Sequence, residues 1–146
     1  MNEINKITEH LCEIDTTLTN YKQNFYLYTV QIVNYALTQA SRNGNTIEVQ
    51  RLLNADADPN ATDPHHYNFT SLHWASENGH SEVVSLLLSR RADPNALEYE
   101  GYSPLDIANS SPIRKILATH GALLSRPIDE NYKKRTCREF HVLDFV

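Results

Sequence analysis

Two stretches of the chain carry nearly the same residues 35 positions apart. Residues 44–61 read GNTIEVQRLLNADADPNA, and residues 79–96 read GHSEVVSLLLSRRADPNA. A leading glycine, three apolar residues and a closing Ala-Asp-Pro-Asn-Ala recur in register. A fixed period of this length indicates a stacked repeat, in which each unit buries its apolar face against the next. An array of this kind leaves one extended face in solvent.

Composition excludes several classes of protein. A chain of 146 residues suits a single domain, and a net charge of −5 argues against non-specific binding of nucleic acid, which needs a basic face. Cys12 and Cys137 lie at opposite ends and make no disulfide framework, which favours a reducing compartment. The first ten residues lack the apolar core of a secretory signal, and no apolar run is long enough to cross a membrane. We therefore expect a cytoplasmic protein.

Hydrophobic spacing predicts two short helices in each repeat. In the middle repeat we expect helices over 70–78 and 81–90, separated by a Gly-His turn. The second helix has apolar residues at i, i+1, i+4 and i+5, which form one stripe of a 3.6-residue helix: Val83, Val84, Leu87 and Leu88. Pro94 should end this helix, because proline donates no backbone hydrogen bond and favours an extended residue before it.

One short motif identifies a family. Residues 70–75, TSLHWA, resemble the ankyrin repeat signature Thr-Pro-Leu-His-x-Ala, with serine in place of proline. The third repeat has SPLDIA at 103–108, and the first has YALTQA at 35–40. The resemblance covers residues 34–122 and implies an all-α fold, an ankyrin-repeat α-solenoid with short β-hairpin loops. It also implies a structural role for His73, whose imidazole bonds the Thr70 hydroxyl and nearby backbone.

The resemblance also divides the chain. We expect an N-terminal helical cap at 1–33, three repeats at 34–66, 67–99 and 100–124, and a C-terminal tail at 125–146 that is helical or partly disordered. Three positions that carry glycine in the family hold Asp56, Asn68 and Arg91 here. We expect a left-handed backbone at all three, tolerated by asparagine and strained in the other two. The third repeat lacks the Gly-His turn, which indicates a terminal, capping repeat.

The N-terminal segment has an apolar stripe of its own. Its members alternate steps of three and four without any glycine or proline: Ile4, Ile7, Leu11, Ile14, Leu18, Tyr21, Phe25, Tyr28, Ile32 and Tyr35. One interpretation is a capping helix, or a helical pair broken near 16–20, laid against the first repeat. The other is a coiled coil that makes a homodimeric scaffold. We favour the cap and a monomer, because a short array needs its open end covered and tyrosines suit a globular interface better than a coiled-coil seam.

The sequence shows no recognisable motif for catalysis or for metal binding. Neither cysteine lies in a motif that places a nucleophile beside a base, and four glycines are few for a phosphate-binding loop. His65 and His66 are adjacent in a lengthened hairpin, so in extended chain they point to opposite sides and would not chelate one ion. We therefore expect a non-enzyme with no cofactor and no metal. An enzyme with an unrecognised site in the flanks is the alternative.

The family resemblance implies a protein partner bound by the hairpin tips and the concave helix face. Transferring those positions to this chain selects Arg42, Asn43, His66, Tyr67, Phe69, Trp74, Glu77, Asn78, Tyr99, Glu100 and Tyr102. Aromatic residues and arginine dominate binding hot spots, so we expect the five aromatic residues in this set to converge on one side. Such a protein would act as an adaptor, an inhibitor or a host-targeting bacterial effector. The last suggestion rests on a composition rich in Asn and Tyr.

The resemblance implies a modification as well. Asn60 and Asn95 each follow an aspartate by two positions and a leucine by eight. This is the pattern of ankyrin asparagines that an asparaginyl hydroxylase modifies. In the tail, a basic cluster lies at 133–138, and we interpret it as a solvated face rather than a binding patch.

Overall fold

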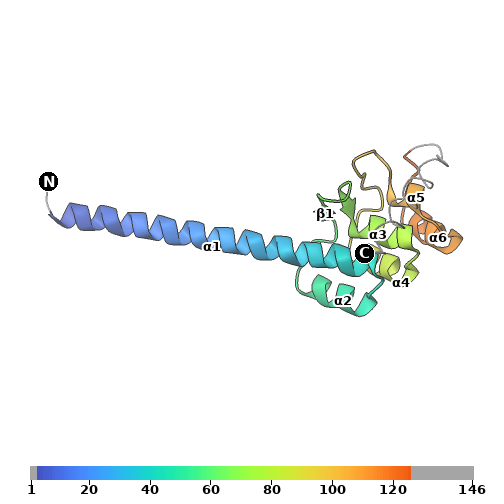
Figure 1. Cartoon of the computed structure of the whole chain (residues 1–146), viewed down its shortest axis with the longest axis horizontal. Coiled ribbons are helices and arrows are strands. Elements are labelled where there is room, and N and C mark those ends of the chain that lie inside the picture. The colour runs from blue at the N-terminus through green and yellow to red at the C-terminus, as the bar shows by residue number, and fades with distance from the viewer. Residues whose placement is uncertain (1–2, 126–146) are drawn as a thin grey trace, which may run out of the picture. The chain divides into compact units, whose positions relative to one another are not determined.

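The structure, a computed structural model, describes residues 3–125 of the chain (Figure 1). In chain order its elements are α1 (Glu3–Arg42), α2 (Thr46–Asn54), β1 (Thr62–Asp63), β2 (Phe69–Thr70), α3 (Ser71–Asn78), α4 (Ser81–Ser89), α5 (Pro104–Ile107) and α6 (Ser111–Thr119). The chain divides into two compact units, Met1–Val33 and Asn34–Val146, and α1 contributes to both. The basic cluster at 133–138 and the rest of the predicted tail after residue 125 lie outside the described residues.

The first unit is built from one helix without interruption. Its sequence has no glycine or proline, and the hydroxyls of Thr16, Thr17, Thr19 and Thr29 donate to carbonyls of the preceding turn. Thr16 and Thr17 both donate to the Glu13 carbonyl, at 2.9 and 2.8 Å. The predicted alternative of a helical pair broken near 16–20 is therefore wrong, since these residues are helical throughout. The assignment of 1–33 as a cap stays a prediction.

The second unit stacks the predicted helix pairs. The first helices pack side by side, α3 against α5, and the second helices form another row, α2 against α4 and α4 against α6. The apolar stripe of α4 lies in this core, with each of its four members no more than 8% exposed. Other buried aliphatic side chains fill the remaining layers, among them Leu37, Val49, Leu52, Leu72, Leu105, Ile113 and Leu117. The all-α repeat architecture expected from the sequence is confirmed.

The second helix of every repeat ends in the same way. Each has a left-handed residue just after its end, with φ values of 61°, 66° and 83° for Asp56, Arg91 and Gly121. The alanine that follows donates to the carbonyl five positions back, at 3.0–3.1 Å, as in a Schellman motif. These bonds close α4 at Ser89, well before Pro94, so the proline does not end the helix. The predicted left-handed backbone at Asp56 and Arg91 is confirmed.

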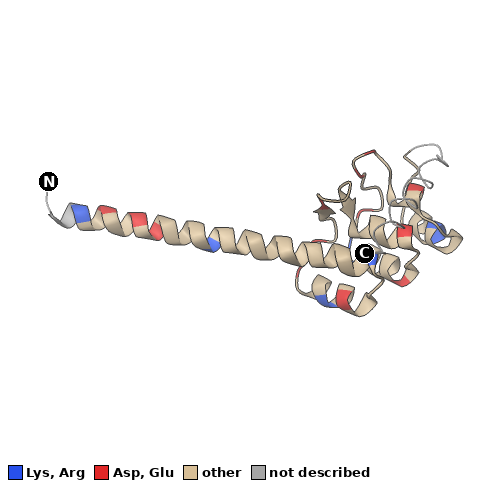
Figure 2. Ribbon diagram, viewed as in Figure 1, with Lys and Arg blue, Asp and Glu red and all other residues tan. Residues whose placement is uncertain are grey.

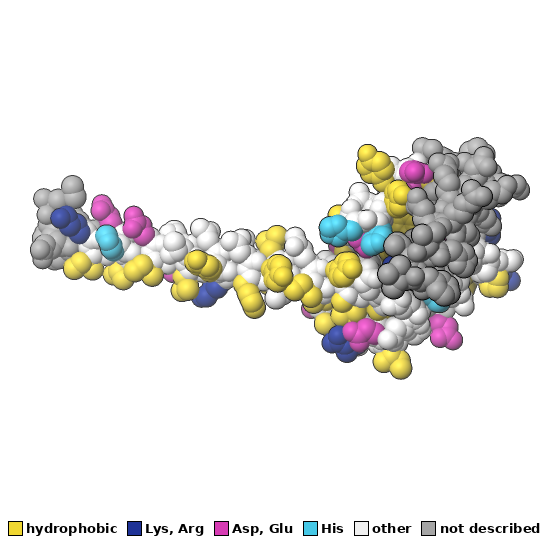
Figure 3. Space-filling view, in the orientation of Figure 1, with side chains coloured by type: hydrophobic (Ala, Val, Ile, Leu, Met, Phe, Trp, Pro, Cys, Tyr) yellow, Lys and Arg dark blue, Asp and Glu magenta, His cyan; other side chains and the backbone are white. Residues whose placement is uncertain are grey.

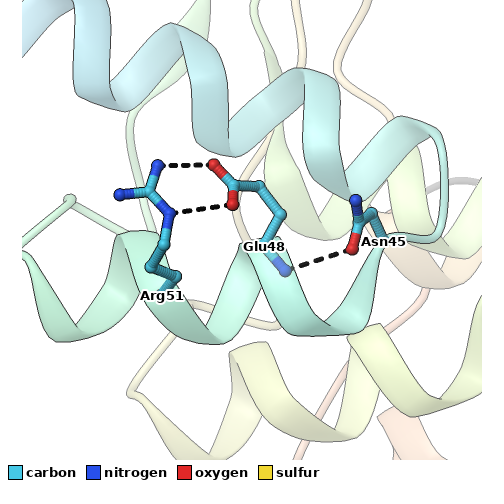
Figure 4. A network of polar contacts seen from close by, with 3 residues as sticks. All are labelled: Asn45, Glu48 and Arg51. Atoms are coloured by element: carbon cyan, nitrogen blue, oxygen red, sulfur yellow. Dashed lines mark hydrogen bonds and ion pairs between the residues drawn. The ribbon is translucent and has the colours of Figure 1, made fainter.

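Local side-chain contacts fix the start of α2 (Figure 4). The Asn45 Oδ1 accepts a hydrogen bond from the Glu48 backbone N–H at 3.1 Å, which satisfies a free donor of the first turn. The Arg51 guanidinium donates to both carboxylate oxygens of Glu48, at 2.8 and 2.6 Å. The hydrogen bond from Arg51 lowers the pKa of Glu48. These residues cap or lie on α2, in the row formed by α2, α4 and α6, and their bonds are exposed to solvent. The network therefore stabilises the start of a helix and does not form a functional site.

A two-stranded hairpin joins the first and second repeats. Strands β1 and β2 are antiparallel, with Thr62 opposite Thr70 and Asp63 opposite Phe69. At its tip, Tyr67 and Asn68 both have positive φ, at 53° and 57°, and Phe69 N–H donates to the His66 carbonyl at 2.9 Å, as in a type I′ turn. The left-handed Asn68 was predicted. The left-handed Tyr67 was not, and it turns the tyrosine ring outward at 51% exposure.

Candidate protein-interaction surface

Three of the predicted contact aromatics belong to the core. Trp74 is 1% exposed, Phe69 2% and Tyr102 7%, and with Ile107 they make one buried cluster. The Phe69 and Trp74 ring centroids lie 4.9 Å apart. The expectation that Phe69, Trp74 and Tyr102 contact a partner is thus corrected. Their rings pack the first hairpin against α3 and the following repeat, so they are not exposed contact residues.

His73 ties this cluster to the next repeat, the structural role implied by the family motif. Its Nδ1 accepts from the Thr70 backbone N–H at 3.2 Å and lies 2.8 Å from the Thr70 hydroxyl oxygen. Its Nε2 lies 3.0 Å from the Tyr102 carbonyl oxygen, so the ring proton belongs on Nε2. Burial lowers the pKa of His73 to about 4, against the opposing effects of the Tyr102 carbonyl and Asp106. The ring is neutral and structural.

Trp74 positions two polar residues at the surface. The Arg42 Cζ lies 4.8 Å from the Trp74 ring centroid, a cation–π contact. The His66 ring meets Trp74 edge to face, with centroids 5.6 Å apart. Both residues are half-buried, so the predicted contact positions Arg42 and His66 are held by a core tryptophan rather than lying beside an exposed one.

Glu77 is a half-buried carboxyl one turn further along α3. Burial raises its pKa to about 7, and the nearby positive charge of Arg42 only partly offsets this. Glu77 therefore changes its charge near neutral pH. The neighbouring Asn78 is exposed and donates from Nδ2 to the Trp74 carbonyl at 2.9 Å.

The remaining predicted residues lie in solvent on the tips of two successive hairpins. Tyr99 is 80% exposed and Tyr67 51%, and the Tyr99 N–H donates to the Tyr67 carbonyl at 2.8 Å. That bond joins one tip to the next, so the two tyrosines stand on adjacent tips. We name His66, Tyr67, Tyr99 and Glu100 the tip surface. Asn43, at the end of the first helix of the first repeat, is also exposed.

Two buried carboxylates that the sequence analysis missed shape these tips. Asp63, 1% exposed, accepts from the His65 N–H at 3.0 Å and pairs with His66 Nδ1 at 2.9 Å. Glu98, 5% exposed, accepts from the backbone N–H groups of Glu100 and Tyr102 at 2.9 and 3.0 Å. A signal was present, because both acids stand two positions after the closing alanine of the repeated Ala-Asp-Pro-Asn-Ala. Among residues 3–125, no three acidic, histidine or cysteine side chains gather as they would around a metal ion.

The two asparagines predicted to be hydroxylated form a ladder along the array. Asn60 accepts from the Asp93 N–H at 2.7 Å and donates to the Arg91 carbonyl at 3.3 Å. Asn95 repeats this one unit later, with the Leu123 N–H at 2.8 Å and the Gly121 carbonyl at 3.1 Å. Their amides therefore hold successive repeats together. Hydroxylation itself stays a prediction.

Comparison with known proteins gives one clear similarity. The family model for ankyrin repeats in three copies matches residues 7–98 and 37–127. No curated protein matches the chain. In the part of the chain that the structure describes, no helix is long and apolar enough to cross a membrane.

Proposed function

This chain belongs to the ankyrin repeat family, and from that premise we propose that it binds a protein partner through the tip surface. Repeats of this family are general protein–protein interaction modules. The observation that carries the proposal is the pair of exposed tyrosines on adjacent hairpins, linked by the bond from the Tyr99 N–H to the Tyr67 carbonyl. Tyrosine offers a large contact area together with a hydroxyl, which is why it is enriched where proteins bind one another.

The backbone at Tyr67 adds weight to this assignment. A positive φ is costly for a bulky residue, and glycine or asparagine would relieve it. The hairpin turn and the hydrogen bond from Tyr99 hold Tyr67 in that conformation, with its ring outward. The buried cluster of Phe69, Trp74 and Tyr102 supports both tips from below. A rigid platform of this kind lowers the entropy lost on binding.

Polar residues along the first helices extend the proposed surface. Asn43 and Asn78 are exposed, while Arg42 lies over the Trp74 ring and, like Glu77, is half-buried. An aromatic centre with a polar rim is the usual anatomy of a protein interface. Above about pH 7 the Glu77 side chain is negative and the Arg42 side chain is positive. The polar rim therefore offers charges of both signs to a partner.

We propose that the protein acts by binding rather than by catalysis, as an adaptor, an inhibitor or a host-targeting bacterial effector. Its place of action would be the cytoplasm, or the cytosol of a host cell in the last case. Two alternatives differ in class: a homodimeric scaffold whose repeats are passive, and an enzyme with a site in the flanks. Binding that depends on the tip surface speaks for the first proposal, against repeats that are passive and against an enzyme with its site in the flanks.

The test compares two double variants in quantitative affinity capture from native and host-cell lysates. Tyr67→Ala with Tyr99→Ala removes both exposed rings of the tip surface. Ile47→Ala with Leu123→Ala removes two side chains that are 85% and 70% exposed elsewhere, and serves as the matched control. We expect the tyrosine variant to lose specific partners that the control keeps, with unfolding temperatures equal to the wild type within about 2 °C. Equal capture by both variants would contradict the proposal.

A further inference from the structure

The helix of the first unit carries an apolar stripe that nothing in that unit covers. Eight of its large apolar side chains are between 50% and 76% exposed: Ile7, Leu11, Ile14, Leu18, Tyr21, Phe25, Tyr28 and Ile32. Figure 3 shows hydrophobic side chains recurring along α1. The unit consists of one helix among its described residues, and an unbroken helix cannot fold back on itself. The cover must come from outside the unit.

We propose that α1 pairs with α1 of a second copy as an antiparallel two-helix coiled coil. In the register that overlaps the two stripes completely, Ile7 lies opposite the partner's Ile32. Leu11 then lies opposite the partner's Tyr28, Ile14 opposite the partner's Phe25, and Leu18 opposite the partner's Tyr21. A two-fold axis relates the copies, so each contact occurs twice.

The spacing of the stripe favours a second helix over a broad protein surface. Its steps alternate three and four without exception, which is a repeat of 3.5 residues and the period of a left-handed coiled coil. A helix that packs on a globular core shows a wider apolar face, with additional positions filled in every turn. In residues 7–21 the apolar positions keep to the narrow seam, because the residues between them are polar apart from Cys12. The strict seam therefore fits a partner that carries the same seam.

Side-chain size sets the direction of the pair. The first half of the stripe is aliphatic, Ile7 to Leu18, and aromatic residues occupy Tyr21, Phe25 and Tyr28 in the second half. A parallel pair in register would set each aromatic ring against its own copy in three successive layers. The antiparallel register instead places one ring against one aliphatic side chain in each of those layers. Layers of equal volume pack at the density of protein interiors without voids or strain.

Charge favours the same direction. Glu9, Glu13 and Asp15 lie in the first half of the helix, and Figure 2 shows these acids clustered toward its N-terminal end. A parallel pair would bring the two acidic halves together, whereas an antiparallel pair separates them. Asp15 and Lys22 both directly follow a stripe residue, so they flank the seam on the same side. The antiparallel register brings Asp15 beside the partner's Lys22, once on each half of the pair.

The exposed area is sufficient for a stable dimer. With half or more of each side chain in solvent, the eight contribute on the order of 100 Å² each, or about 800 Å² per helix. A standard protein interface buries about 800 Å² on each partner. A dimer reverses our expectation of a monomer from the sequence, which assumed that the stripe lies against the first repeat.

Light scattering of the full chain at micromolar concentration tests the dimer. Leu18→Glu with Phe25→Glu places charges on the stripe. Thr16→Glu with Gln23→Glu adds the same charges at the same spacing on exposed positions away from it. We expect twice the monomer mass for the wild type and the control, and the monomer mass for the stripe variant, with an unchanged unfolding midpoint for the repeats. A monomeric wild type, as a stripe covered by the chain's own repeats would give, overturns the proposal.

Disulfide trapping tests the register. In a background of Cys12→Ser with Cys137→Ser, one preparation carries Leu11→Cys and another carries Tyr28→Cys. An antiparallel pair cross-links only when the two preparations are mixed and oxidised, because residue 11 of one copy meets residue 28 of the other. Cross-linking within each separate preparation would show a parallel pair and refute the register. None of these changes touches the tip surface, so the outcome is independent of partner binding.

Discussion

The second and third repeats begin their first helix with the same device, built from different residues. Thr70 caps α3, with His73 N–H donating to its hydroxyl oxygen at 3.3 Å and the His73 ring accepting from its backbone N–H. Ser103 caps α5 in the same reciprocal way, and the Asp106 carboxylate accepts from the Ser103 N–H at 2.7 Å. Yet α3 runs for eight residues and α5 for four.

The two repeats differ in the segment of chain that packs against each of them. His73 has a second nitrogen, which faces the Tyr102 carbonyl of the next repeat at 3.0 Å. Asp106 has no further repeat among the described residues, and its carboxylate accepts instead from the hydroxyl and backbone N–H of Ser125. Burial alone would raise the pKa of Asp106, but the hydrogen bonds from Ser125 and Ser103 outweigh it and lower the pKa. A histidine suits an internal repeat because it donates on one side and accepts on the other, whereas a carboxylate only accepts.

Replacing each residue by alanine should separate the two roles. We expect His73→Ala to lower the free energy of unfolding by about 3 kcal/mol, since it opens a cavity and leaves the Tyr102 carbonyl without its buried donor. Asp106→Ala should cost about 1 kcal/mol, the usual value of a lost helix cap. Urea unfolding at pH 7 measures both.

His73→Asp is the sharper control for this comparison. It keeps an acceptor for the Thr70 N–H, as in the third repeat, but sets a buried carboxylate against the Tyr102 carbonyl. It should therefore be no more stable than His73→Ala. A stability close to that of the wild type would show that the bond from His73 to the next repeat contributes little.

The pH dependence of stability offers a second way to probe α3. Its two side chains with shifted pKa values, His73 and Glu77, change the stability in opposite directions as pH falls. With a pKa of about 4 in the fold, His73 binds fewer protons than the unfolded chain, so its contribution to stability falls as pH drops from 6.5 to 4. With a pKa of about 7, Glu77 binds more protons in the fold than in the unfolded chain, so its contribution rises as pH drops from 7 to 4.5. In the wild type the two contributions partly cancel, so stability should change less over this range than either group alone would cause.

Two substitutions should remove this balance. Glu77→Gln leaves only the histidine, so stability should fall by about 2 kcal/mol between about pH 7 and pH 4.5. His73→Gln leaves only the carboxyl, and stability should rise over the same interval by a smaller amount, because Glu77 is only half-buried. Thermal unfolding across this range measures both slopes. Parallel profiles for the two variants would show that neither pKa is shifted by the fold.

The three Schellman turns supply a comparison of smaller effect. The third repeat has glycine at the left-handed position, whereas the first and second have Asp56 and Arg91. Arg91→Gly should raise the free energy of unfolding by about 1 kcal/mol, and Gly121→Ala should lower it by a similar amount. A Cβ at Gly121 would meet no atom within 4 Å, so only the backbone cost is measured there. Chemical denaturation resolves both changes. A loss of stability in Arg91→Gly would mean that contacts of the arginine side chain stabilise the fold by more than its left-handed backbone costs.

Local features of this fold could be predicted from the sequence, and features set by the next repeat could not. The helix pairs, their apolar stripes and the left-handed Asp56, Asn68 and Arg91 follow from spacing and from the family signature. The burial of Phe69 and Tyr102 depends on how one hairpin lies on the following repeat, and a strand of two residues gives no alternation to read. The sequence left open whether α1 is continuous or broken near 16–20, because threonines are poor helix formers and their hydroxyl bonds to the preceding turn are not visible in spacing.

The rate of asparagine hydroxylation should differ between the last repeat and the internal ones. We expect no measurable change in stability from the modification. Asn60 bonds to the loop at Arg91 and Asp93 between two repeats, whereas Asn95 bonds to Gly121 and Leu123 beyond α6. The end of an array opens locally at a lower free energy than its centre, so an asparaginyl hydroxylase should reach Asn95 first. Intact mass after coexpression should show one added oxygen before two, peptide mapping should place it at Asn95, and Asn95→Ala should delay the first addition. Modification of Asn60 before Asn95 would mean that the loop between repeats opens as readily as the end of the array.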